Sequence, residues 1–103
     1  MTPVSTSGSG ASEWLDLSRP GEYRIDTDIA SGISTTVTFQ TCTEAMPEPK
    51  KLRSPASPAD EWQITESEAF YIKGPCKFRH TEDRASGSGD VKTHAQFVDD
   101  GVR

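Results

Sequence analysis

The sequence of 103 residues contains no asparagine and two cysteines. Without asparagine the chain has no N-glycosylation acceptor, and it lacks the Asn-Gly pair that favours tight β-hairpins. Two cysteines, Cys42 and Cys76, are too few for a disulfide scaffold. We expect both to be free thiols, because cytosolic proteins keep cysteine reduced. A bridge between them would require their two predicted strands to face each other.

Long apolar runs are also missing. No stretch approaches the ~20 residues of a membrane-spanning helix, so we expect no membrane partner. Residues 1–7 have neither the basic start nor the apolar stretch of a secretory signal, which predicts a protein made in a cytosol. The formal charge is −5, whereas a duplex-binding protein needs excess Lys and Arg to displace phosphate counterions. We therefore expect no nucleic-acid partner.

Apolar residues make up only 32% of the chain, which predicts one domain with a thin core. The aromatic residues should form much of this core, because each of them can bury a large area. We expect four phenylalanines to be buried: Phe39, Phe70, Phe78 and Phe97. A core this thin would gain stability from oligomerisation or from docking onto a larger body.

Three apolar runs with a period of two fill the last third of the sequence. They cover residues 69–73, 76–80 and 91–98, and they are separated by Gly74-Pro75 and by the Ser-Gly-Ser-Gly-Asp segment 86–90. This alternation between breaker residues is typical of half-buried antiparallel strands. We interpret segment 86–90 as a hairpin turn.

The same pattern occurs upstream. Residues 13–17 and 22–26 read as strands around a turn at 19–21, and residues 33–42 form the longest β-branched run. A short strand is expected at 62–65. The sequence therefore predicts an all-β fold, a small antiparallel β-sandwich or a jelly-roll-like barrel.

Two segments do not fit this pattern. Residues 1–12 are rich in Ser, Thr and Gly, which predicts a flexible N-terminal arm before a single domain at 13–103. Residues 43–61 contain four prolines, so we expect a long loop there. We expect both segments to become ordered on contact with neighbouring subunits.

The sequence does not match the motifs for catalysis and metal binding with which we compared it. Asp26 and Asp28 resemble the start of an EF-hand loop, but Ala30 and Val37 occupy later ligand positions. The cysteines and histidines lack the close pairs of zinc sites. There is no G-x-S-x-G nucleophile motif. We therefore predict a protein that is not an enzyme, with no catalytic residues, no metal and no cofactor.

Residues 68–79 followed by 86–91 resemble the C-terminal part of small β-sandwich virion proteins of tailed bacteriophages. In that family a strand, a Gly-Pro corner, a strand and a Ser-Gly-Asp turn recur near the C-terminus. Segments 17–23 and 36–40 are similar to the first strands of such proteins. The Pro-rich segment 43–61 departs from the simplest form of the family and leaves its subtype open.

This resemblance implies a structural virion protein, made in the host cytoplasm, that binds the capsid exterior as a decoration or cement protein. It implies the major capsid protein or other virion subunits as partners. Because neighbouring copies would cover sandwich edges that a monomer leaves exposed, we also expect a homo-oligomer such as a trimer. We expect the partner-binding residues to be Lys50, Lys51 and Arg53, which would meet an acidic patch. The alternative is a carbohydrate-binding or adhesion module that stacks sugars on Trp14, Trp62 or Tyr71.

Overall fold

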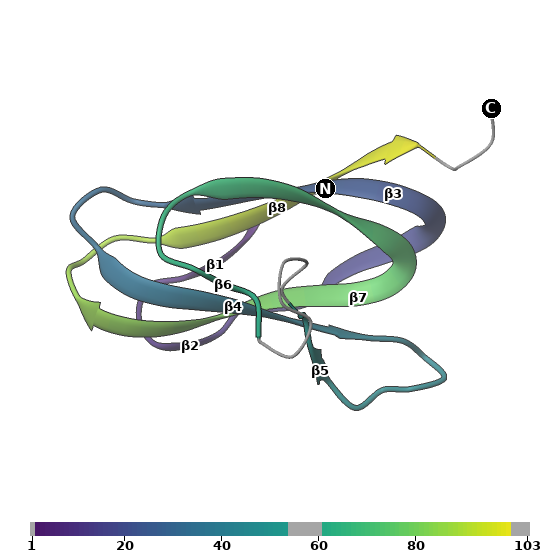
Figure 1. The fold of residues 1–103 in the computed structure, drawn as a ribbon, viewed down its shortest axis with the longest axis horizontal. Coiled ribbons are helices and arrows are strands. Elements are labelled where there is room, and N and C mark those ends of the chain that lie inside the picture. The colour runs from purple at the N-terminus through teal and green to yellow at the C-terminus, as the bar shows by residue number, and fades with distance from the viewer. Residues whose placement is uncertain (1, 54–60, 100–103) are drawn as a thin grey trace.

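The computed structural model describes residues 2–53 and 61–99, and it confirms the predicted all-β, antiparallel class (Figure 1). Among these residues there is no helix, and hence none long and apolar enough to cross a membrane. The strands are β1 (Val4–Thr6), β2 (Gly10–Ala11), β3 (Leu15–Ile29), β4 (Ser34–Cys42), β5 (Lys50–Lys51), β6 (Gln63–Ile64), β7 (Glu68–Ser86) and β8 (Val91–Asp99).

The strands form one curled sheet in the order β1-β8-β3-β7-β4-β5, with β2 added to β7 and β6 added to β4. The two long strands bend, so the sheet folds over itself into two facing layers (Figure 1). The first layer contains β1, β8, the second half of β3 and the first half of β7. The second layer contains β2, the first half of β3, the second half of β7, and β4 with β5 and β6.

The predicted strand breaks at 19–21 and at 74–75 are wrong. The chain continues through both segments as β3 and β7, and the two sites lie opposite each other, because Gly21 is the register partner of Gly74. The register shifts between Leu17 and Gly21, which is a bulge in β3. Breakers on two neighbouring strands therefore form a common corner, where both strands pass from one layer to the other.

Glycine is required at this corner for a steric reason. A Cβ atom on Gly74 would lie 2.7 Å from the carbonyl oxygen of Arg19 and 2.8 Å from the ring of Tyr23. Gly21 has a φ of 131°, a conformation that residues with side chains rarely adopt. The corner is closed further by a hydrogen bond of 2.9 Å from the Arg19 backbone N–H to the Tyr23 hydroxyl.

The predicted hairpin at 86–90 is also wrong. The segment does connect β7 to β8, but β8 pairs with β3 and β1 instead of with β7. The connection therefore carries the chain from the second layer to the first. Gly87 and Gly89 have φ values of 98° and 127°, which lets the backbone make this turn.

The predicted flexible N-terminal arm is not confirmed, because residues 2–12 contribute two short strands to the sheet. Val4 pairs with Thr93 of β8, and Ala11 pairs with Thr81 of β7. We call this segment the N-terminal strap, because it joins the edge of one layer to the edge of the other. Apart from the buried Val4 and Ser12 it is mostly exposed or intermediate, and strand pairing holds it instead of apolar burial.

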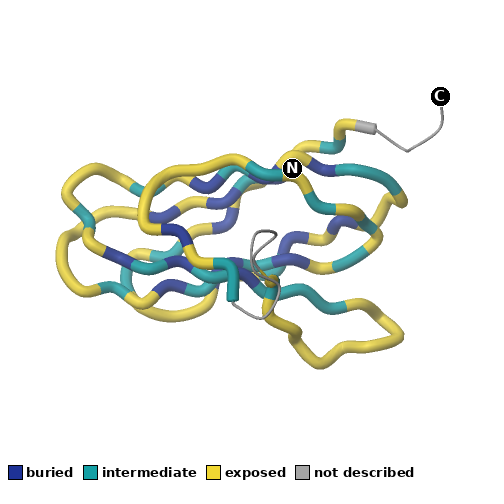
Figure 2. The backbone as a smooth tube through the Cα atoms, in the orientation of Figure 1, coloured by how far each residue is buried: buried dark blue, intermediate teal, exposed yellow. Residues whose placement is uncertain are grey.

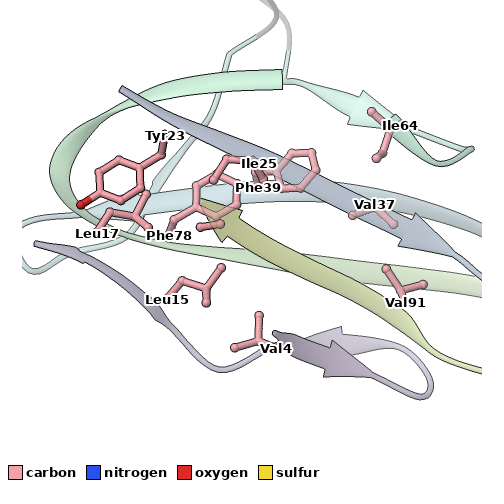
Figure 3. Close-up of a cluster of buried hydrophobic side chains, with 11 residues drawn as sticks. Val4, Leu15, Leu17, Tyr23, Ile25, Val37, Phe39, Ile64, Phe78 and Val91 are labelled. Atoms are coloured by element: carbon pink, nitrogen blue, oxygen red, sulfur yellow. The ribbon is translucent and has the colours of Figure 1, made fainter. Parts of the chain in front are cut away.

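Buried residues alternate with exposed ones along the strands (Figure 2). Phe39 and Phe78 are fully buried as predicted, whereas Phe70 and Phe97 are partly buried. The ring of Phe39 lies 4.9 Å from that of Phe70 and 5.4 Å from that of Phe78, between centroids. The buried cluster comprises Val4, Leu15, Leu17, Tyr23, Ile25, Val37, Phe39, Ile64, Phe78, Val91 and Ala95 (Figure 3).

The Pro-rich segment 43–61 is partly described. Within it Lys50–Lys51 form β5 on the edge of β4, and Arg53 makes an isolated β-bridge with Glu61. Residues 54–60 lie outside the described part of the chain, so the predicted loop remains a prediction for them.

Candidate partner-binding face

Four side chains form one row across the outer surface of the second layer. The guanidinium of Arg79 lies 4.3 Å from the ring centroid of Trp14, a cation–π contact. Arg79 also donates a hydrogen bond of 2.8 Å from Nε to Oε1 of Gln40. Gln40 is the register partner of both Arg79 and Lys51. The row therefore joins β4, β5, β7 and the residue before β3.

Polar residues flank this row. Asp16 faces Lys77 in the register of β3 and β7, which places opposite charges side by side. On the other flank the hydroxyl groups of Thr38 and Thr81 are hydrogen-bonded to each other. We define the docking face as the outer surface formed by Trp14, Asp16, Thr38, Gln40, Lys51, Lys77, Arg79 and Thr81.

The three predicted partner-binding residues lie in β5 and just after it, next to β4. Lys51 pairs with Gln40 in the row. Lys50 pairs with Thr41, and because successive residues of a strand alternate between its two faces, this pair lies on the opposite face of the sheet. Both lysines are exposed. Lys51 also forms an ion pair with Glu61, with Nζ and Oε2 3.6 Å apart. Lys51 thus belongs to the docking face, whereas Lys50 lies on the opposite face of β5 and Arg53 follows β5 in a β-bridge with Glu61.

Sequence reasoning missed Trp14, Gln40 and Arg79 as members of one surface. The alternation of Lys77, Phe78 and Arg79 along one strand does indicate that the two cations share a face. The partners of Arg79 come from other strands, and strand register is a long-range property that this alternation does not reveal.

A second polar cluster lies inside the sandwich. The Nδ1 atom of His80 is 2.7 Å from the hydroxyl of Thr93, and its Nε2 atom is 2.9 Å from the hydroxyl of Thr6. Thr6 donates to Oε1 of Glu82 over 2.7 Å, and Arg84 forms an ion pair with the same carboxylate. The strap residue Thr6 therefore completes the hydrogen bonding of two titratable groups.

Burial lowers the pKa of His80 from 6.5 to about 4. Burial by itself would raise the pKa of Glu82, but hydrogen bonds from Arg84 and Thr6 lower it below its ordinary value. Near neutral pH the cluster thus holds a neutral imidazole and an ion pair with their partners in place. These groups are engaged in holding the strap to the strands.

A cleft of about 460 Å³ lies beside the docking face. Its lining includes Asp16 and Lys77 of that face together with Thr43, Glu44 and Cys76. Cys76 and Cys42 are both free thiols and partly buried, as expected for unpaired cysteines. Burial raises the pKa of the Cys76 thiol, and a protonated thiol is a poor nucleophile and a poor metal ligand. Among the described residues there is no group of three or more candidate metal ligands.

The three aromatic residues considered for sugar stacking lie in different surroundings. Trp62 packs against Phe70, with ring centroids 6.0 Å apart, and Arg79 covers the ring of Trp14. Tyr71 is 56% exposed on the outer surface of the first layer.

Comparisons with protein-family models, with curated proteins and with solved structures found no match.

Proposed function

We propose that this chain is a non-enzymatic structural protein of a virion, which binds the capsid exterior as a decoration protein through its docking face. The observation that carries the proposal is the row of Trp14, Arg79, Gln40 and Lys51, because these residues come from separate strands and form one broad surface. Surfaces that bind proteins are enriched in Trp and Arg, and this surface combines both. The resemblance of residues 68–79 and 86–91 to small β-sandwich virion proteins of tailed bacteriophages supports the virion setting.

The partner of this face would be the major capsid protein, presenting carboxylates beside an apolar patch. Arg79 is already held by Trp14 and Gln40, so it would lose little side-chain entropy when a carboxylate binds it. The Lys51 side chain is 58% exposed and forms an ion pair with Glu61, so a carboxylate of the partner would compete with Glu61 for this lysine. Contacts between exposed charges are screened by salt, which predicts attachment that weakens as ionic strength rises.

The test is co-sedimentation of the full chain with tailed-phage heads that lack decoration protein. We expect Arg79→Glu and Lys51→Glu to reduce binding at least tenfold, because each places a negative charge where the partner's carboxylates dock. Lys92→Glu is the matched control, since Lys92 is an exposed lysine of β8 in the other layer. Equal binding by all variants would place the contact elsewhere and contradict the proposal.

A second candidate function is carbohydrate binding, favoured by the exposure of Tyr71. Its register partner is Arg24, whose partner on the other side is Gln96, so an exposed ring lies beside two hydrogen-bonding side chains. A glycan array with the full chain tests this function. If the chain binds a sugar, loses this binding in Tyr71→Ala and does not bind capsids, carbohydrate binding would replace capsid decoration as the proposed function.

A further inference from the structure

Among the residues that the structure describes, the first half of β7 has a strand beside it on one side only, so its other side is an open edge. Residues 68–73 pair with β3 on one side, whereas β4 and β2 join β7 from residue 77 onward. Among the described residues no other strand pairs with segment 68–73. Elsewhere short strands of two or three residues cover parts of the outer edges, namely β1, β2, β5 and β6. No strand in the described part of the chain covers segment 68–73 in this way.

The composition of this edge favours association. Tyr71 is 56% exposed, and the inward-pointing Phe70 and Ile72 remain only partly buried at the rim of the core. The segment contains no proline, and its register with β3 has no shift from Gly74 to Glu68. Long, regular apolar edges are the ones that pair with another chain, because their outward N–H and C=O groups lack partners.

We propose that segment 68–73 pairs antiparallel with the same segment of a second copy, with Tyr71 at the two-fold axis. A sheet that continues across the axis keeps the inner faces of both copies on the same side. With Tyr71 at the axis, Phe70 lies opposite Ile72 of the second copy, and Tyr71 lies opposite its own equivalent. The half-buried apolar rims of both cores would then cover each other.

The charges of the outer surface fit this register. Lys73 of the second copy would lie opposite Ala69, and the other neighbour of Ala69 is Asp26 of the same chain. Alanine is small, so the long side chain of Lys73 can extend over it toward the Asp26 carboxylate, which Arg24 of the same chain also holds in an ion pair of 3.1 Å. Glu68 would face Gly74, so no like charges oppose each other along the pairing. A second copy therefore matches this edge in shape and in charge.

The pairing goes beyond the proposed capsid contact and does not depend on it. The edge belongs to the first layer, whereas the docking face belongs to the second. Variants at one surface therefore leave the other surface intact, so an experiment can refute either proposal without affecting the other.

The test is light scattering of the full chain across a concentration series. We expect a mass that rises to twice the 11.2 kDa of one chain. Tyr71→Lys should stay monomeric, because it places two like charges at the axis, and Val98→Lys is the control, since Val98 is 50% exposed in β8. Equal thermal unfolding of both variants would show that both are folded. A wild-type monomer at every concentration, a trimer, or an unchanged Tyr71→Lys dimer would overturn the proposal.

Crosslinking tests the register directly. In a chain with Cys42→Ser and Cys76→Ser, Tyr71→Cys should form a disulfide-linked dimer with a mild copper–phenanthroline oxidant in air, because equivalent residues at a two-fold axis are adjacent. Gln96→Cys is the control, since Gln96 lies two strands away in the same row. Equal crosslinking of both variants would overturn the register.

Discussion

Lowering the pH from neutrality to about 4.5 should destabilise this protein through His80, which is held in its neutral form inside the sandwich. The imidazole is 0% exposed, and its pKa is lowered from 6.5 to about 4 by burial. In the unfolded chain the same group binds a proton below its ordinary pKa. Unfolding therefore takes up a proton between these two values, and the folded state loses stability as the pH falls through that window.

The magnitude follows from the size of the shift. The pKa moves from 6.5 to about 4, and each unit of pKa corresponds to about 1.4 kcal/mol, so the complete loss is about 3.5 kcal/mol. At about pH 4.5 most of this loss, about 2.5 kcal/mol, should be present. Glu82 affects stability at lower pH than His80 does. Because its pKa is lowered in the folded state, its carboxylate stabilises the fold above the ordinary pKa of 4.5, and this stabilisation is lost as the pH falls below that value.

The assay is urea unfolding followed by tryptophan fluorescence at a series of pH values. His80→Gln should flatten the dependence of the unfolding free energy on pH above about pH 4.5, because it removes the buried imidazole whose pKa is lowered. A histidine titration by NMR should show His80 still neutral at about pH 5. A His80 that titrates near its ordinary value, or an unchanged slope in His80→Gln, would refute the reasoning.

Three further predictions concern stability. Phe39→Ala should cost about 3–5 kcal/mol in urea unfolding, because Phe39 is 0% exposed and contacts two other rings; a loss below about 1 kcal/mol would contradict its central place. Gly74→Ala should destabilise by more than about 1 kcal/mol, because its Cβ would meet backbone oxygens, while Gly8→Ala, with open space around it, should stay within about 0.5 kcal/mol. Cys42→Ser combined with Cys76→Ser should fold, and the intact mass of the native chain should show two free thiols.

Local patterns of the sequence predict the faces of single strands well. The alternation in residues 33–42 places Val37 and Phe39 in the core, and both are fully buried. The same logic fails at Gly21 and Gly74, because a breaker residue normally ends a strand. These two glycines lie opposite each other on paired strands, so the sheet bends without losing its pairing. That coincidence depends on contacts between residues far apart in the sequence.

The N-terminal strap shows the same limit. Its composition is that of a linker, yet Thr6 bonds His80 and Glu82, which are 74 and 76 residues away. Polar partners at such separations carry no local signal in the sequence. The candidate site has the same limit. The sequence shows Lys51 as part of a basic cluster, but Lys51 and Arg79 lie in one row only because both strands pair with Gln40 of β4.

Strand β7 connects the two surfaces proposed for assembly. Its first half forms the open edge around Tyr71, and its second half supplies Lys77 and Arg79 to the docking face. The corner at Gly74 separates these halves into different layers, so one contact does not block the other. A pair of copies joined at the edge would present two docking faces on one rigid body. Linked sites bind a repeating lattice more tightly than a single site does, provided that the spacing matches. A thin-cored domain would thereby gain strong attachment without any one large interface.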